Sequence, residues 1–144
     1  MRSEDRRGIA TLRFKLQRVQ YMPKELQPGV LYVSEEFGIA IHLCACGCGC
    51  KIRTALGPTE FSVQETPEGP SLSPSVGSWQ RACKSHYWIR RGEVVWSVKW
   101  TPEQIANGRA REEARRQAYY RELDRGRGGI WGRLRRWVES FLRR

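Results

Sequence analysis

This sequence of 144 residues has no long apolar run, no apolar segment near its start and only two histidines. Without a run of about 18 apolar residues, no membrane-spanning helix is predicted. The first residues, Met1 to Arg7, lack the apolar core of a secretory signal, so we expect a cytoplasmic protein. The length allows one ordinary domain with an appendage.

Acidic residues are the scarcer charged class, 15 against 26 basic residues, and the formal net charge is +11. Residues 101–144 carry more than half of this excess, and every basic side chain in that segment is an arginine. Such a balance favours an acidic protein, an anionic membrane or nucleic acid as a partner. Because no recognised nucleic-acid-binding motif accompanies the charge, nucleic acid is the weakest of these three.

Alternating apolar and polar residues predict a small, mainly β domain over residues 1–100. The strands are expected at 9–22, 30–33 and 39–43, as one or two strands within 51–63, and as a hairpin over 86–100 that turns at 90–93. Residues 66–78 contain three prolines, four serines and two glycines, and this composition predicts a loop.

Residues 101–144 are predicted to form an Arg-rich helical extension, which makes the fold α+β overall. Thr101 and Gln104 have the spacing of a capping box, and Pro102 suits the first helical position. Three glycines at 126, 128 and 129 are expected to end this helix and separate it from a second one at 130–143. The second helix is amphipathic, and we expect it to dock on an acidic protein, a membrane, the sheet or a second copy.

Four of the five cysteines fall within seven residues, and the fifth, Cys83, begins a Cys-x-x-His pair that ends at His86. An odd number of thiols without an export signal favours metal binding over disulfides. Zinc prefers four Cys or His ligands, and an Fe–S cluster or a metal-free fold is the alternative. We therefore predict a zinc site, structural if closed and catalytic if open. Its ligands are expected to be four of Cys44, Cys46, Cys48, Cys83 and His86, with Cys50 in reserve and His42 as a weaker candidate.

Five segments together resemble a bacterial domain-of-unknown-function family that is found beside genes for ubiquitin-like modifiers with their E1-like and E2-like enzymes. A Cys-x-Cys-Gly-Cys-Gly box at 44–49 and a Cys-x-Ser-His box at 83–86 carry most of the resemblance. The other matching stretches lie at 29–34, 74–79 and 92–96. The chain differs from the family pattern in the extra thiol of Cys50, in Ser78 where Asn is expected, and in the Arg-rich tail.

The resemblance implies a zinc-site β domain in a bacterial ubiquitin-like conjugation pathway. Its partners would be the modifier or the E1-like and E2-like enzymes. The resemblance also suggests the pathway's deconjugating peptidase, a deubiquitinase-like hydrolase. Two alternatives remain open: a non-catalytic zinc-stabilised module that binds the modifier or a conjugation enzyme, and a nucleic-acid-binding zinc protein. A homo-oligomer is compatible with each of them.

A peptidase needs a nucleophile, a base and an oxyanion site. If His86 binds zinc, His42 is left as the base, and the catalytic candidates are then Ser75, Ser85 and His42. Ser78 or an unligated thiol is a further nucleophile, and an open zinc with Glu36 or Glu93 as base is another route. Against these roles, a serine beside cysteines can hydrogen-bond a sulfur, a serine in a Pro-rich loop can cap a turn, and a histidine on an apolar strand can pack in the core.

Overall fold

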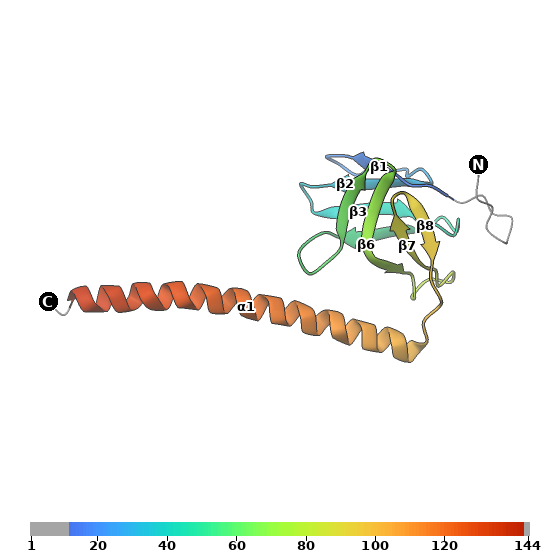
Figure 1. The fold of residues 1–144 in the computed structure, drawn as a ribbon. Coiled ribbons are helices and arrows are strands. Elements are labelled where there is room, and N and C mark those ends of the chain that lie inside the picture. The colour runs from blue at the N-terminus through green and yellow to red at the C-terminus, as the bar shows by residue number, and fades with distance from the viewer. Residues whose placement is uncertain (1–11, 143–144) are drawn as a thin grey trace. The chain divides into compact units, whose positions relative to one another are not determined.

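The computed structural model describes residues 12–142, and the chain divides into two compact units, Met1–Lys99 and Trp100–Arg144. The described part of the first unit consists of two four-stranded sheets, and the second unit contains one long helix (Figure 1). This confirms the mainly β class with a C-terminal helical extension. The elements are β1 (Lys15–Arg18), β2 (Val30–Ser34), β3 (Ile39–Leu43), β4 (Lys51–Ala55), β5 (Ser62–Thr66), β6 (Gly69–Gly77), β7 (His86–Arg90), β8 (Glu93–Trp96) and α1 (Pro102–Leu142).

The first sheet has the order β1-β2-β3-β4, with β1 parallel to β2 and the other pairs antiparallel. All five residues of β2 are buried, as its continuous apolar sequence predicts. β3 begins and ends where the alternation of Ile39–Leu43 predicts. The predicted strand at 9–22 is shorter in the structure, where β1 covers Lys15–Arg18, and residues 9–11 lie outside the described residues.

The second sheet has the order β5-β6-β7-β8 and is antiparallel throughout. The predicted hairpin over 86–100 is confirmed as β7 and β8, although β8 ends at Trp96. Arg91 and Gly92 join the two strands with φ angles of 48° and 78°. Two consecutive positive φ angles characterise the tight hairpin turn whose twist matches that of the strands.

The structure corrects the loop expected at 66–78, because most of it is the central strand β6. Leu72 and Val76 of this strand are buried in the core, 1% and 3% exposed, and β6 pairs with β5 on one side and β7 on the other. Pro74 lies where the β6–β7 register shifts. Because the regular hydrogen-bond ladder is interrupted there, the N–H that proline lacks is not needed. Packing on both sides therefore overrides the local turn composition.

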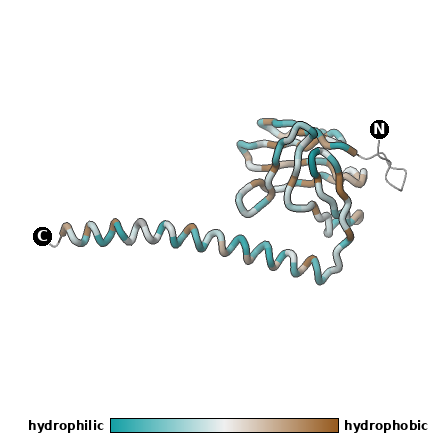
Figure 2. The backbone as a smooth tube through the Cα atoms, in the orientation of Figure 1, coloured by the Kyte–Doolittle hydropathy of each residue, from teal (hydrophilic) through white to brown (hydrophobic). Residues whose placement is uncertain are grey.

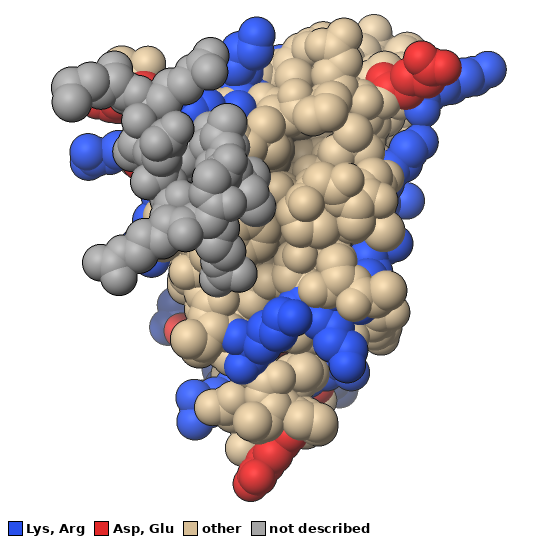
Figure 3. Space-filling model, turned by 90° about the vertical axis from the view of Figure 1, so that its right-hand side faces the viewer, with Lys and Arg blue, Asp and Glu red and all other residues tan. Residues whose placement is uncertain are grey.

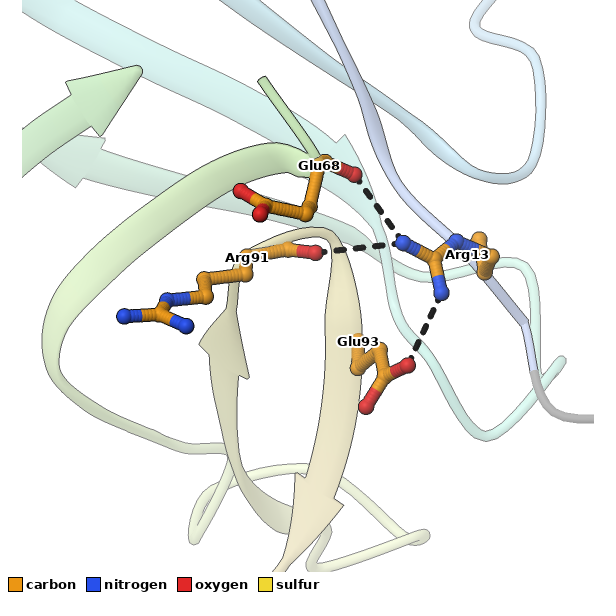
Figure 4. Close-up of polar contacts among 4 residues, drawn as sticks. All are labelled: Arg13, Glu68, Arg91 and Glu93. Carbon is orange, nitrogen blue, oxygen red and sulfur yellow. Dashed lines mark hydrogen bonds and ion pairs between the residues drawn. The ribbon is translucent and has the colours of Figure 1, made fainter. Parts of the chain in front are cut away.

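The two sheets share one hydrophobic core, and the segment before β1 fastens them together. Phe14 is 2% exposed, and its N–H donates to the carbonyl oxygen of Gly92 over 2.7 Å. The Arg13 guanidinium reaches the Glu93 carboxylate at 2.8 Å and the carbonyl oxygens of Glu68 and Arg91 at 3.0 and 3.4 Å (Figure 4). One arginine thus holds the β5–β6 and β7–β8 turns against the N-terminal segment.

Helix α1 begins as predicted, with Pro102 as its first residue. The Thr101 N–H donates to Gln104 Oε1 over 2.9 Å, and the Gln104 N–H donates to Thr101 Oγ1 over 3.2 Å, which confirms the capping box. The expected break at Gly126, Gly128 and Gly129 is wrong, because the helix continues to Leu142. A glycine lowers helix stability by about 1 kcal/mol but does not block the backbone hydrogen bonds as proline does. Within the described residues, no helix combines the length and apolar character needed to cross a membrane.

Candidate functional site

Cys44, Cys46 and Cys48 lie, together with Cys50, in the turn that connects β3 to β4; the first three belong to a group of four sulfurs described below. The strands end at the pair Leu43–Lys51, and the Cys44 N–H then donates to the Cys50 carbonyl over 2.8 Å, which closes the turn. Gly47 and Gly49 have φ angles of 85° and 77°, values that glycine adopts without strain. The glycines therefore bend the chain here, as the sequence predicts.

The fourth cysteine of the group comes from the loop between β6 and β7. The Ser78 N–H donates to the Ser85 carbonyl over 2.8 Å, and this bond closes the loop around Cys83. The Arg81 guanidinium donates to the Lys51 carbonyl over 2.9 Å. This contact ties the Cys83 loop to the end of the β3–β4 turn.

The two segments bring four sulfur atoms together. The Sγ atoms of Cys44, Cys46, Cys48 and Cys83 all lie within 4.8 Å of one another, and the first two are 3.4 Å apart. Zinc bound by four thiolates at about 2.3 Å separates the sulfurs by about 3.8 Å. The four thiols are free and have the number, chemistry and spacing of a closed tetrahedral metal site. Of the five predicted ligands, His86 is outside this group, and so is the reserve Cys50.

The four thiols are not in equivalent surroundings. Burial raises the pKa of the Cys44 thiol to about 12. At Cys83, hydrogen bonding from the Ser85 side chain is the main cause that lowers the thiol pKa to about 6. The Ser85 side chain also hydrogen-bonds Cys44. Ser85 therefore serves the cysteine group, and its side chain faces sulfur in the way that ligand-supporting residues do.

His86 forms a chain of hydrogen bonds with a serine and a main-chain carbonyl. Its Nε2 atom lies 2.9 Å from Ser75 Oγ, and its Nδ1 atom lies 2.9 Å from the Val98 carbonyl oxygen. A carbonyl only accepts hydrogen bonds, so Nδ1 carries the proton. In the neutral ring Nε2 is then the acceptor and receives the hydrogen bond of the Ser75 hydroxyl. A hydroxyl, an imidazole and a carbonyl are thus linked by hydrogen bonds, which is the order that a serine nucleophile, its base and the group orienting the base would require.

The irregular pairing of β6 with β7 places Ser75. Leu72 pairs with Ile89 and Val76 pairs with Tyr87, so three residues of β6, from Ser73 to Ser75, face Trp88 alone. Such a bulge re-aims side chains that a regular ladder would hold in alternation. Ser75 is half-buried, whereas His86 is 4% exposed. The Ser75 hydroxyl therefore lies at the edge of the core, and the His86 imidazole that it contacts is buried.

One ring packs against the imidazole of His86, and one main-chain hydrogen bond holds the Val98 segment near it. The Trp79 ring packs against it with ring centroids 4.8 Å apart and an interplanar angle of 62°. The Ser97 N–H donates to the His86 carbonyl over 2.9 Å, which holds the segment after β8 beside β7 and so positions Val98.

Ser78 is buried at 6% exposure, and its Oγ has no hydrogen-bond partner among the described residues.

The structure places His42 in the core. Its Nε2 lies 2.8 Å from the Tyr87 hydroxyl, and its ring packs edge-on against Phe14. Burial lowers the pKa of His42 to about 4, so the ring is neutral near pH 7. The Tyr87 hydroxyl also accepts the Ala45 N–H at 3.4 Å, so this pair supports the cysteine turn. His86, and not His42, contacts Ser75.

The sequence selected Ser75 and offered His42 and His86 as the two possible bases, but the Cys-x-x-His spacing directed His86 to the metal and so favoured His42. One signal was present in the sequence: His86 begins the predicted strand, whereas Cys83 lies before it in the loop. Val98 could not be found from residue type, since its carbonyl is common to every residue.

A family model described as "Bacterial ubiquitination-like system serine protease (BubE)" matches residues 18–97. The matched range contains the four clustered cysteines, Ser75 and His86, and it leaves out α1. A search of curated proteins gives no significant match, and a search of solved structures gives none either.

Proposed function

This chain belongs to the family of bacterial ubiquitination-like system serine proteases (BubE), and from that membership we propose that it is a serine peptidase that cleaves the acyl bond at the C-terminus of a ubiquitin-like modifier. Such cleavage would process the modifier or remove it from a target. The proposal is supported most directly by the hydrogen-bonded line from Ser75 through His86 to the Val98 carbonyl. The modifier and its E1-like or E2-like enzymes are the proposed partners.

In this mechanism Ser75 is the nucleophile and His86 the base. Ser75 Oγ attacks the carbonyl carbon while its proton passes to His86 Nε2. The imidazolium then gives this proton to the leaving group as the scissile bond breaks, and an acyl-serine remains. Water, deprotonated by the same nitrogen, hydrolyses the acyl-serine and restores the hydroxyl.

The Val98 carbonyl takes the place that a carboxylate has in the Ser-His-Asp triad. It accepts a hydrogen bond from the Nδ1–H group at every step of the reaction. The bond therefore fixes the orientation of the ring and stabilises the positive charge that forms on the imidazole. A neutral carbonyl stabilises that charge less than a carboxylate does, because hydrogen bonds to ionised groups are roughly twice as strong.

We propose zinc as the metal of the cysteine group and a structural role for it. Cys44, Cys46, Cys48 and Cys83 supply four ligands, which leaves no open position for substrate or water. Zinc, when bound, would neutralise the thiolates and join the β3–β4 turn to the loop that precedes His86. Glu93, one of the bases considered for an open zinc, is held in an ion pair with Arg13 at 2.8 Å.

The proposal is tested with the full chain and the modifier fused at its C-terminus to a short peptide. We expect cleavage by the wild type and a loss of about a thousandfold or more for Ser75→Ala. Ser73→Ala, two residues away in the same strand and exposed, is the matched control and should keep the rate. A fluorophosphonate probe should label Ser75. Equal rates for Ser75→Ala and the wild type would refute the assignment, and binding of the modifier without cleavage would favour a non-catalytic module.

A further inference from the structure

The positive charge of α1 is concentrated in its second half. Residues 102–124 contain five arginines and five acidic residues, whereas residues 125–142 contain five arginines and one acidic residue. By contrast, the face of the molecule in Figure 3 shows Lys and Arg in separate groups on a largely uncharged surface. The last turns of the helix are thus a distinct basic segment.

The same turns carry a continuous apolar stripe. At about 100° per residue, the apolar positions between residues 131 and 142 fall within a sector about 140° wide. Hydrophobic and hydrophilic positions alternate along the tube of this helix in Figure 2. A single helix cannot bury its own stripe, and the six side chains are 42–82% exposed. They are Trp131, Leu134, Trp137, Val138, Phe141 and Leu142.

The order of residues around the helix is that of a helix lying in a membrane interface. Trp137 lies at one edge of the stripe and Trp131 about 20° inside the other edge. Arg133 and Arg135 come directly beyond the two edges. Indole rings favour the boundary between apolar and polar surroundings, and arginines beside them reach outward to anionic headgroups.

A second copy of the chain fits this surface less well. If two helices faced each other through their stripes, Arg133 and Arg135 of one helix would lie near the same arginines of the other. Between residues 131 and 142, Glu139 is the acidic residue available to neutralise them. Glu139 already pairs with Arg135 at 3.2 Å within the same helix. A dimer would therefore collect like charges along both sides of its seam. A sector of 140° is also wider than the narrow seam of a coiled coil.

We propose that residues 131–142 form an in-plane anchor that binds the surface of a bilayer rich in anionic lipids. The apolar stripe lies among the acyl chains near the headgroups, and the arginines contact the lipid phosphates. The anchor does not depend on the proposed peptidase activity, because Ser75 and His86 belong to the other unit. It attaches the chain to a membrane without crossing it.

The test is vesicle flotation of the full-length protein. We expect the wild type to float with phosphatidylglycerol–phosphatidylethanolamine vesicles and to remain behind with phosphatidylcholine vesicles. The Trp131→Ser/Trp137→Ser variant keeps every charge. Its vesicle binding should be at least about tenfold weaker, since the two indole rings at the boundary of the stripe are lost. Added salt should weaken binding by the wild type.

The matched control removes two exposed apolar side chains from the electrically neutral half of the same helix. Tyr120 and Leu123 are 54% and 45% exposed, and Tyr120→Ser/Leu123→Ser should float like the wild type. Circular dichroism of each variant checks that the helix persists. Three results would overturn the proposal: equal flotation of the two double variants, a dimer that requires Trp131 and Trp137 while vesicles go unbound, or binding to polyglutamate without binding to vesicles.

Discussion

His86 Nδ1 lies 2.9 Å from the carbonyl oxygen of Val98, so a main-chain atom orients the imidazole that contacts Ser75. The Val98 side chain itself is 76% exposed. Substitution of that side chain therefore leaves the orienting group in place. The position of the carbonyl depends instead on the backbone of the segment after β8, where the Ser97 N–H donates to the His86 carbonyl.

The first prediction concerns this backbone. Ser97→Pro removes the N–H that holds the segment beside β7, and we expect peptidase turnover to fall about tenfold to a hundredfold as the Val98 carbonyl moves. Ser97→Ala keeps the N–H and should retain the rate, as should Val98→Ala. Steady-state cleavage of the modifier fusion measures all three. A Ser97→Pro enzyme as active as Ser97→Ala would show that the carbonyl has no orienting role.

The second prediction concerns the metal. The purified chain should contain one zinc, and Cys83→Ser should abolish its binding, with the midpoint of thermal unfolding lowered by about 10 °C or more. Cys50→Ser is the matched control, because Cys50 is outside the group of four sulfurs. Elemental analysis and differential scanning fluorimetry give both values. Unchanged metal content in Cys83→Ser would contradict the ligand set.

The third prediction concerns Gly77, whose place allows the Trp79 ring to pack beside His86. A Cβ at Gly77 would clash with the Trp79 Nε1 atom, so Gly77→Ala must displace the indole. We expect turnover to fall about tenfold. Gly57→Ala, where the nearest atom to the new Cβ is 3.8 Å away, should leave turnover unchanged. An active Gly77→Ala enzyme would mean that the indole does not position the imidazole.

The fourth prediction separates the two histidines. Tyr87→Phe removes the hydroxyl that hydrogen-bonds buried His42 and the Ala45 N–H, and the free energy of unfolding should fall by about 1–3 kcal/mol. Turnover of the folded protein should persist, because His86 keeps both of its hydrogen bonds. Urea unfolding and kinetics at low urea measure the two effects. Loss of turnover without loss of stability would instead give His42 a part in the chemistry.

The sequence predicted the strands whose side chains alternate between core and solvent, and β3 is the clearest case. It failed at β6, because the stability of a Pro- and Ser-rich strand comes from neighbours on both sides that lie far away in the chain. The predicted break at Gly126 to Gly129 was also wrong, because a continuous helix tolerates the low helix propensity of these glycines.

At the site, the meeting of the cysteines could be predicted because the proposed metal site would restrict ligands to few residue types and short spacings. The serine–histidine pair was harder to predict, since both residues have common structural roles. Ser75 and His86 meet only because a bulge in β6 offsets the register against β7. That offset depends on tertiary pairing, which residue spacing does not record.

The length of α1 has a mechanical consequence. Forty-one helical residues form a rod about 60 Å long, at 1.5 Å per residue. A flexible linker of similar residue number would let its two ends approach each other freely. The rod instead acts as a spacer, which keeps the surface bound by its last turns at a fixed distance from its first turn. This distance limits which substrates on the same surface the chain can reach.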